Sequence, residues 1–444
     1  MDFPFSIFHF PFSIFHFPFS YLAIILSIIS EGYFVAKIGF GTYRISDLNP
    51  EHIQAIRTAV EEGVDLIDTS TNYMDGAAER AIALAFQPLP TKIISDVEVI
   101  SKFGYIQGST LQRIKEGEHF AETVEFAEHI FHCISPEFMR DQLTKSLERL
   151  NMDSLDCYLI HNPEYFILDE LNKDLDRNEV LDRMFARIEK SFVALEQEVQ
   201  NGRIKSYGIS SNSFAKPSND PEFLPYEDLV TIAKRAAMEA GSKTHHFTTV
   251  QLPINLLETE GLKCAAWAKH NDIRVLVNRP LNAEANALMF RLASYNEPHD
   301  YYHHLNEVLE MTDDPALESI HNMIAQLDDV KHRFGFIGEY EQFLHVQVIP
   351  HFQKTLESLD TSVVELLAES LDLFLQEYAR MVAFECTKMT KVQLKEKLVG
   401  CDKALQVCAL DFLMKQDSID YVLVGMRKPS YVMDVIGIAQ ESRL

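Results

Sequence analysis

The chain has 444 residues, of which 47% are hydrophobic and 24% are charged, and its formal net charge is −26. This composition is typical of a globular protein with a large core, and the length allows a barrel with an added segment, or two domains. The negative charge disfavours nucleic acid and anionic membrane surfaces as partners.

Residues 1–36 form an apolar extension in which the segment at 3–9 (FPFSIFH) repeats at 10–16. A secretory signal needs a basic start, but the first cation is Lys37. The repeated prolines also interrupt any membrane helix. We therefore expect an extension without a folded role on a cytoplasmic protein. The alternative is targeting or membrane anchoring through residues 1–30.

From Lys37 onward, strand patterns alternate with helix patterns. Apolar runs predict strands at 37–43, 64–68, 97–102, 155–161, 205–210, 249–252, 274–277 and 421–424. Helix signals predict helices beginning at Pro50 and Pro136, at 77–86, 180–201, 226–239 and 262–269, and after Pro429. Residues 103–134 are predicted to form a long loop.

Eight strand–helix units in this order predict a closed (β/α)8 TIM barrel, an α/β fold. A doubly wound sheet is the alternative, but it would need a GxGxxG turn opening a helix after its first strand. Gly39 and Gly41 are only a partial match. We interpret these glycines as a sign of close packing at the mouth of the barrel.

The seventh unit is interrupted by a segment of mostly helical pattern. The barrel is thus expected from 37–281 and 401–444, with a helical insertion at 282–400. An apolar stripe at helical spacing runs through Leu367, Leu371, Phe374, Tyr378 and Met381. We expect this stripe to pack on the barrel rim as a cap, or to bind a partner. Because the insertion follows a strand end, it should emerge at the active-site mouth, where it would shape substrate choice while the barrel alone holds the cofactor.

Polar side chains follow the ends of three predicted strands: Asp68 and Tyr73, then Lys102, then His161. The carboxyl ends of parallel barrel strands converge on one mouth. A phenol is a weak acid near neutral pH, and a nearby ammonium lowers its pKa. Tyr73 is the candidate proton donor, and Lys102 is the group that lowers its pKa. Asp68 is the counter-ion of Lys102, and His161 is the group that orients a carbonyl.

At these residues the chain resembles the aldo-keto reductase family. The resemblance rests on IGFGTYR at 38–44, LIDTSTNY at 66–73, ISK at 100–102, YLIHNP at 158–163, YGISSN at 207–212, VQ at 250–251 and VGMR at 424–427. It implies an oxidoreductase that reduces an aldehyde or ketone with NADPH, with Asp68, Tyr73, Lys102 and His161 as its catalytic tetrad. NADH is the other possible cofactor.

The resemblance also implies the positions that hold the cofactor. These are Gly41, Thr42, Ser210, Ser211, Asn212, Gln251, Asn278, Arg279, Gly425, Arg427 and Lys428. The extra serine leaves open whether Ser211 or Asn212 accompanies Ser210 at the carboxamide. Asn278 stands where many relatives carry an aromatic residue under the nicotinamide, and the plane of Arg279 could replace that stacking. Arg427 and Lys428 are expected to bind a 2′-phosphate.

Two alternative functions remain open at this point. The same resemblance includes potassium-channel β subunits, which suggests a noncatalytic nucleotide sensor. An NAD-dependent sugar dehydrogenase is a further alternative. No metal is expected, because neither the histidines at 129 and 132 nor those at 299–304 have the spacing of a zinc motif. The substrate partner is expected to be a small carbonyl compound.

The chain also contains cysteines without a close CxxC pair: Cys133, Cys157, Cys264, Cys386, Cys401 and Cys408. Most stand in apolar surroundings, so we expect reduced thiols in the core.

Overall fold

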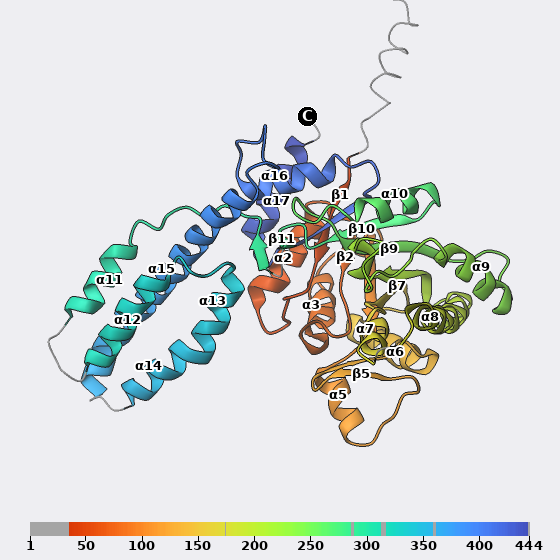
Figure 1. Ribbon diagram of the computed structural model, residues 1–444, viewed down its shortest axis with the longest axis horizontal. Helices are drawn as coiled ribbons and strands as arrows, with labels where there is room; N and C mark the ends of the chain where they lie inside the picture. The colour runs from red at the N-terminus through yellow and green to blue at the C-terminus, as the bar shows by residue number, and fades with distance from the viewer. Residues whose placement is uncertain (1–34, 174, 286–287, 312–316, 358–360, 443–444) are drawn as a thin grey trace, which may run out of the picture.

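The computed structural model describes residues 35–173, 175–285, 288–311, 317–357 and 361–442 (Figure 1). The extension at 1–34 lies outside the described residues. Eight parallel strands within these ranges close into a barrel: β1 (Lys37–Gly41), β2 (Leu66–Asp68), β3 (Glu98–Phe103), β7 (Leu155–His161), β8 (Ile204–Ser210), β9 (Phe247–Pro253), β10 (Arg274–Asn278) and β13 (Tyr421–Gly425). The predicted (β/α)8 barrel is confirmed, and the doubly wound sheet is wrong.

Helices on the outside of the barrel follow these strands. They are α2 (Pro50–Glu61), α3 (Ala77–Phe86), α6 (Pro136–Leu150), α8 (Arg177–Gln200), α9 (Leu229–Glu239), α10 (Leu262–His270), α16 (Leu405–Met414) and α17 (Pro429–Glu441). The predicted helix starts are confirmed at α2 and α6. Asn49 accepts a hydrogen bond from the N–H of Glu51, and Ser135 accepts one from the N–H of Phe138. These side chains satisfy donors that a helix leaves unpaired at its first turn.

Strand register places the ends of neighbouring strands in one layer. His161 pairs with Ser210, and Ser210 pairs with Gln251. Asp68, at the end of β2, pairs with Gly41 on β1. Polar residues from four strands therefore meet at the carboxyl end of the barrel, where sites of this fold lie.

Residues 103–134 contain more structure than the predicted loop. They form β4 (Tyr105–Ile106), α5 (Gly108–Lys115), β5 (Val124–Ala127) and β6 (Ile130–His132), and the strands pair antiparallel in the order β4-β6-β5. The loop assignment is wrong because these strands are only two to four residues long. Alternation over so few residues gives no clear strand signal.

The segment between β10 and α16 begins with a hairpin rather than a helix. The hairpin pairs β11 (Asn282–Ala285) with β12 (Leu288–Arg291). Helices follow: α11 (Tyr301–Glu310), α12 (Glu318–Val330), α13 (Ile337–Phe343), the π-helix η4 (Leu344–Val348), α14 (Ile349–Leu356) and α15 (Thr361–Gln393). Figure 1 shows α11 to α15 extending to one side of the barrel.

The helices of the insertion have a hydrophobic core of their own. All five residues of the predicted stripe on α15 are buried in it, together with Tyr301, Ile324, Tyr340 and Phe352 from the preceding helices. The expectation that the stripe covers the barrel rim or a partner is therefore wrong. The hydroxyl of Tyr378, for example, donates to the carbonyl of Leu327 on α12. Among the described residues of the insertion, those at its two ends, including Ala283, Phe290 and Leu394, join the core of the barrel.

The expectation of reduced cysteines holds for four of the six. Cys133, Cys157, Cys264 and Cys386 are free and buried. Cys401, which precedes α16, and Cys408 within that helix form a disulfide, with their Cα atoms 6.1 Å apart. In the part of the chain that the structure describes, no helix combines the length and the apolar character needed to cross a membrane.

Candidate functional site

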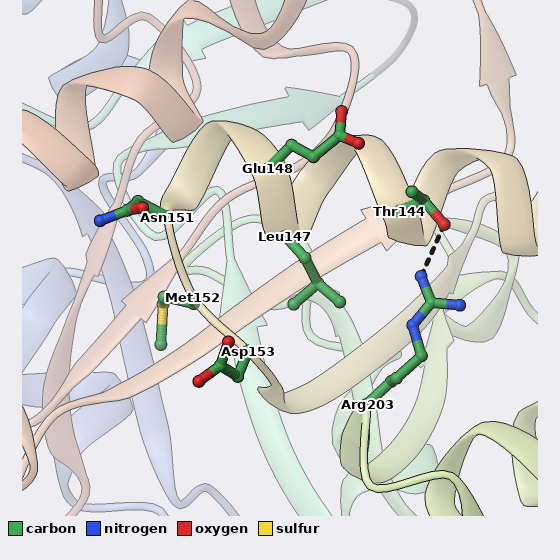
Figure 2. A pocket seen from close by; sticks show the side chains of 7 residues that line it. All are labelled: Thr144, Leu147, Glu148, Asn151, Met152, Asp153 and Arg203. Atoms are coloured by element: carbon green, nitrogen blue, oxygen red, sulfur yellow. Dashed lines mark hydrogen bonds between the residues drawn. The ribbon is translucent and has the colours of Figure 1, made fainter.

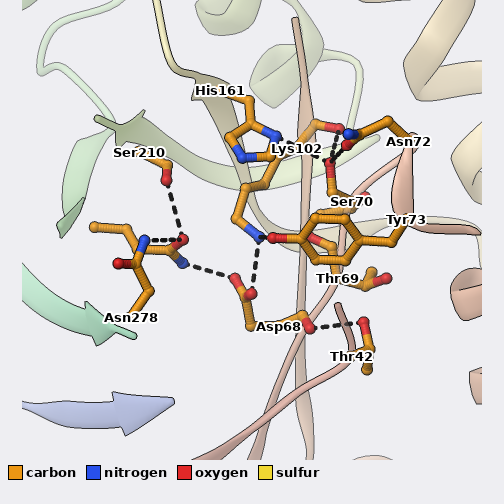
Figure 3. A network of polar contacts seen from close by, with 12 residues as sticks. Thr42, Asp68, Thr69, Ser70, Asn72, Tyr73, Lys102, His161, Ser210 and Asn278 are labelled. Atoms are coloured by element: carbon orange, nitrogen blue, oxygen red, sulfur yellow. Dashed lines mark hydrogen bonds and ion pairs between the residues drawn. The ribbon is translucent and has the colours of Figure 1, made fainter. Parts of the chain in front are cut away.

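The four side chains predicted from the strand ends meet at the mouth of the barrel (Figure 3). The ammonium of Lys102 lies 2.8 Å from a carboxylate oxygen of Asp68 and 3.2 Å from the phenol oxygen of Tyr73. The ring of His161 faces the ring of Tyr73 edge-on, with centroids 6.0 Å apart. Residues separated by up to 93 positions in the sequence therefore form one cluster.

Lys102 uses all of its hydrogen-bonding capacity inside this cluster. Its ammonium, which has three donors, contacts Asp68, the backbone carbonyl of Thr69 at 2.8 Å, and Tyr73. The phenol oxygen of Tyr73 is thus an acceptor toward Lys102. Its own O–H proton must point elsewhere, and it is free to donate to a molecule in the mouth.

Burial is the largest single influence on the pKa values of Tyr73 and Lys102. Burial raises the pKa of Tyr73, and the charge of Lys102 opposes that rise only in part. Lys102 lowers the pKa of Tyr73, as predicted, but burial has the larger effect, so the phenol is protonated at neutral pH. Burial disfavours the charge on Lys102, but Asp68 and Tyr73 more than compensate and raise the pKa of Lys102.

His161 is neutral and oriented by a hydroxyl. Burial, followed by the charge of Lys102, lowers the pKa of His161 well below its usual range. Its Nδ1 lies 3.1 Å from the hydroxyl oxygen of Ser70, which also lies 2.7 Å from the amide oxygen of Asn72. Because the Ser70 hydroxyl donates its one proton to Asn72, it can only accept from His161, so Nδ1 carries the proton of the neutral ring and Nε2 is left as an acceptor. Ser70 and Asn72 were not among the predicted residues, although both lie in the segment that carries Asp68 and Tyr73.

A second polar layer connects the cluster to the expected cofactor residues. Gln251 donates to Asp68 at 2.7 Å and accepts from Ser210 at 3.0 Å and from Asn278 at 3.4 Å. Thr42 donates to the backbone carbonyl of Asp68. The structure thus brings Thr42, Ser210, Gln251 and Asn278 to the tetrad.

Ser211 and Asn212 differ in their contacts and in their exposure. The hydroxyl of Ser211 donates to the carboxylate of Glu164 at 2.8 Å, and the backbone N–H of Asn212 donates to the same carboxylate. The residue Ser211 is buried, whereas Asn212 is exposed. Ser211 is therefore committed to Glu164, and Asn212 remains available at the mouth beside Ser210.

Glu164 is a site residue that the sequence analysis missed. It follows β7 and is buried, and it ties the end of β7 to the end of β8 through Ser211 and Asn212. Burial raises the pKa of Glu164 to about 7, although these hydrogen bonds lower it. An acid three residues after His161 follows the same strand-end pattern that identified the tetrad, so the signal was present.

Several residues with a strained backbone conformation lie close to these strand ends. Asn162 follows His161 with a φ of 48°, Arg279 follows Asn278 with a φ of 51°, and Met74 follows Tyr73 with a φ of 49°. Residues other than glycine rarely adopt this left-handed conformation, and it is found preferentially at functional sites.

A cleft of about 320 Å³ opens beside the tetrad, between the barrel and the insertion. From the barrel, it is lined by Gly41, Tyr43, Arg44, Arg279, Pro280, Leu281, Leu423, Val424, Gly425 and Arg427. Tyr43 connects the cleft to the tetrad, because its ring packs edge-on against the ring of Tyr73 with centroids 5.3 Å apart. Lys428 is not part of this lining, and its ammonium lies 3.8 Å from the carboxylate of Glu51.

The glycines at the cleft leave space open. For Gly39, the predicted close packing is confirmed, because a Cβ atom added there would lie 2.8 Å from the side chain of Leu423. At Gly41 the nearest atom would be 3.7 Å away, and at Gly425 it would be 3.8 Å away. The packing interpretation is therefore wrong for Gly41. Gly41 and Gly425 instead form a floor of bare backbone under the cleft.

Another hollow, of about 340 Å³, lies at the opposite end of the barrel (Figure 2). It is lined by the end of α6, the turn into β7 and Arg203, which precedes β8 and donates to Thr144. Conserved chemistry in this fold sits at the other end of the strands, so this hollow is not a candidate active site.

The histidines considered as metal ligands are not gathered at the mouth. His129 is exposed, and the ring nitrogen of His132 contacts the backbone carbonyl of His161 at 2.7 Å. On α11, donor atoms of His303, His304 and Glu307 lie within 4.8 Å of one another at a partly exposed position. A surface group of this kind does not by itself identify a metal site.

Comparisons with known proteins agree on the kind of protein. Prostaglandin F synthase 1 of Bos taurus is 25% identical over 187 residues, which cover 41% of this chain and 49% of that protein. An NADH-specific methylglyoxal reductase of Escherichia coli (strain K12) is 28% identical over 138 residues, covering 29% of this chain and 38% of that protein. The chain thus spans about half the length, or less, of the curated relatives it matches.

Among solved structures, an aldo-keto reductase from Bacillus halodurans in its holo form is 15% identical, with a TM-score of 0.46 and coverage of 92% of this chain and 90% of that one. An aldo-keto reductase from Klebsiella pneumoniae in complex with NADPH is 21% identical, with a TM-score of 0.34 and coverage of 56% and 64%. These scores are too low to support an argument. The model of the Aldo/keto reductase family matches residues 37–322, which is more than half of the chain. The chain therefore belongs to the aldo/keto reductase family.

Proposed function

We propose that this protein reduces an aldehyde or ketone to an alcohol by hydride transfer from NADPH, with Tyr73 as the proton donor. The observation that carries the proposal is the arrangement around Lys102. Its three donors are occupied by Asp68, Thr69 and Tyr73, so the phenol proton of Tyr73 is directed away from Lys102. A neutral, oriented phenol at a barrel mouth can donate the proton that a developing alkoxide needs.

Each side chain of the tetrad has its own role in the proposed reaction. NADPH, when bound, supplies the hydride. Tyr73 donates its O–H to the carbonyl oxygen, and the ammonium of Lys102 stabilises the phenolate that remains after the proton is transferred. Asp68 keeps Lys102 charged in this buried position. His161, held by the contact between its Nδ1 and Ser70, lies edge-on to Tyr73 and orients the substrate at the mouth.

The residues at the mouth fit a nicotinamide dinucleotide. The buried polar atoms that have no partner among the described residues include the amide oxygen of Asn278 and Nε of Arg279. Such atoms are costly unless a ligand satisfies them. The carboxamide would be held by Ser210 and Asn212, and the open floor at Gly41 and Gly425 would admit the cofactor backbone. Arg279 is paired with Glu258 at 2.5 Å, which leaves it less able to stack under the nicotinamide than expected.

Arg427 and Lys428 support the choice of NADPH over NADH. Both precede α17, whose N-terminus favours an anion, and Arg427 lines the cleft. An arginine and a lysine at this place suit a 2′-phosphate.

An absorbance assay at the nicotinamide band tests the proposal. The purified protein is mixed with NADPH or NADH and with a panel of aldehydes, ketones and sugars. Loss of NADPH with at least one carbonyl compound is the expected result. Nucleotide binding without turnover of any compound would favour a noncatalytic sensor. Reduction of NAD by sugars alone would favour the dehydrogenase alternative.

A further inference from the structure

A chain of polar side chains runs from the start of α5 to the ring of His161. The amide nitrogen of Asn72 donates to the amide oxygen of Gln107 at 3.1 Å. The hydroxyl of Ser70 donates to the amide oxygen of Asn72 at 2.7 Å, and its oxygen lies 3.1 Å from Nδ1 of His161. Figure 3 shows the inner three of these side chains. Gln107 is thus the outer end of the chain, and His161 is the inner end.

Each link in this chain fixes the direction of the next one. An amide oxygen can only accept and an amide nitrogen can only donate. Because the amide nitrogen of Asn72 is turned to Gln107, its oxygen is turned to Ser70 and takes the single hydroxyl proton. Nδ1 of His161 must then donate to Ser70. Since burial and the charge of Lys102 lower the pKa of His161, the ring is neutral and its Nε2 carries a lone pair.

The backbone carbonyl of Lys102 favours the same direction. It lies 3.4 Å from the hydroxyl oxygen of Ser70, and a carbonyl can only accept. Ser70 therefore has two acceptors besides the ring of His161, and donation to either of them leaves Nδ1 as the donor. No described residue forms a hydrogen bond with Nε2 of His161, so its lone pair is left for a bound molecule.

Gln107 is held in place by the docking of α5 on the turn that follows Tyr73. It is the N-cap residue of α5 and has an extended backbone. The carboxylate of Asp75 accepts from both the backbone N–H and the hydroxyl of Ser109, in the first turn of the helix. A Cβ atom at Gly108 would lie 2.5 Å from a carboxylate oxygen of Asp75, so only glycine admits this contact. The start of α5 is therefore fixed against the segment that carries the phenol of the tetrad.

We propose that Gln107 is a positioning residue that sets the tautomer of His161 through the two side chains between them. This inference rests on the proposed function, because His161 orients the substrate there. The amide oxygen of Gln107 accepts from Asn72, which fixes the direction of every link up to the ring. The mouth thereby presents a donor at Tyr73 and an acceptor at Nε2 of His161, on rings that face each other edge-on. A substrate that matches this donor and this acceptor is held in one orientation.

Nitrogen NMR of the full chain with isotope-labelled histidine tests the proposal, because a protonated ring nitrogen and an unprotonated one have different chemical shifts. The signals of His161 are those that are lost in His161→Gln. Wild type should carry the ring proton on Nδ1. Gln107→Glu keeps an acceptor toward Asn72 and should keep this tautomer. Gln107→Lys can only donate, which reverses the amide of Asn72 and the hydroxyl of Ser70, so the ring proton should move to Nε2.

Turnover of a carbonyl compound measures the consequence for the reaction. Gln107→Leu removes the outer acceptor, so kcat/KM should fall by about three- to tenfold, the range for one neutral hydrogen bond. Nucleotide dissociation constants should stay near those of wild type, and Gln107→Glu should restore most of the lost kcat/KM. In a Ser70→Ala background the chain is already cut, so Gln107→Leu should have no further effect. Gln112→Leu is the matched control at an exposed position of α5, and it should leave kcat/KM unchanged.

A wild-type ring proton mainly on Nε2, or the same tautomer in Gln107→Glu and Gln107→Lys, would overturn the assignment. An equal loss of kcat/KM from Gln107→Leu with and without Ser70 would also overturn it, because an effect that passes through Ser70 cannot persist without that side chain. The spectra are recorded without turnover. They therefore decide the tautomer even if wild type reduces no carbonyl compound, a result that would overturn the proposed function alone.

Discussion

The phenol oxygen of Tyr73 lies 3.2 Å from the ammonium nitrogen of Lys102, inside a site in which the lysine side chain is fully buried. The contact has two consequences. It fixes the direction of the phenol proton, because the lysine can only donate. It also places a positive charge where the phenolate forms, so the charge stabilises the product of proton transfer more than the reactant.

Replacing Tyr73 with phenylalanine tests this contact most directly. The ring stays and the proton donor is lost, so turnover should fall by at least about 100-fold, the usual scale for general acid catalysis. Nucleotide binding should stay within a few-fold of wild type. Tyr302→Phe, at an exposed position on α11, is the matched control and should keep full activity. Wild-type turnover in Tyr73→Phe would remove Tyr73 from the mechanism.

The buried pair of Asp68 and Lys102 gives a prediction about stability. Lys102→Met leaves the carboxylate of Asp68 buried without its cation, which should lower the free energy of unfolding by about 3–5 kcal/mol. The double variant Asp68→Asn with Lys102→Met carries no charge at this pair, so most of that stability should return. Its activity should not return, because no ammonium faces Tyr73. Denaturant unfolding of wild type, Asp68→Asn, Lys102→Met and the double variant measures the coupling, and equal stability of Lys102→Met and the double variant would contradict it.

The pair Arg427 and Lys428 should govern the choice of cofactor. Replacing both with alanine should weaken NADPH far more than NADH, since each lost charge-assisted contact costs about 1.5–3 kcal/mol. Lys415→Ala, an exposed lysine paired with Asp411 on α16, controls for the loss of surface charge. Titration of both nucleotides decides the question. Equal weakening of the two would mean that these residues form no 2′-phosphate clamp.

The barrel and the tetrad were predictable from the sequence because each strand is an apolar run that ends at a polar residue. Asp68 and His161 are the last residues of β2 and β7, so the common end of parallel strands brings them together without further information. The short strands at 103–134 were not predictable, because two to four residues carry too little pattern to distinguish a strand from a loop.

Contacts between distant segments account for the other differences. The stripe on α15 was recognisable, but its partners lie on α11 to α14 and not on the barrel, and spacing within one helix does not identify the surface it covers. Likewise, Glu164 and Ser211 are 47 positions apart. The acid was visible at a strand end, whereas its hydrogen bond to the end of β8 depends on the closed barrel.

Glu164 gives a prediction about pH, because burial raises its pKa to about 7 in the folded protein from 4.5 in an unperturbed chain. Between these values the folded state holds a proton that the unfolded state has lost, so this residue lowers stability progressively as pH rises from about 4.5 to about 7. Glu164→Gln cannot ionise. Its amide oxygen can still accept from the N–H of Asn212, and its amide nitrogen can donate to Ser211.

Unfolding free energies of wild type and Glu164→Gln should therefore diverge with pH. The variant should gain on wild type by up to about 3 kcal/mol between pH 5 and pH 8, since one pKa unit corresponds to about 1.4 kcal/mol. Ser211→Ala is the matched second variant. It removes a hydrogen bond that lowers the pKa of Glu164, so the decline of its stability should extend to higher pH than in wild type. Parallel pH profiles of wild type and Glu164→Gln would show that the carboxyl of Glu164 does not titrate in this range.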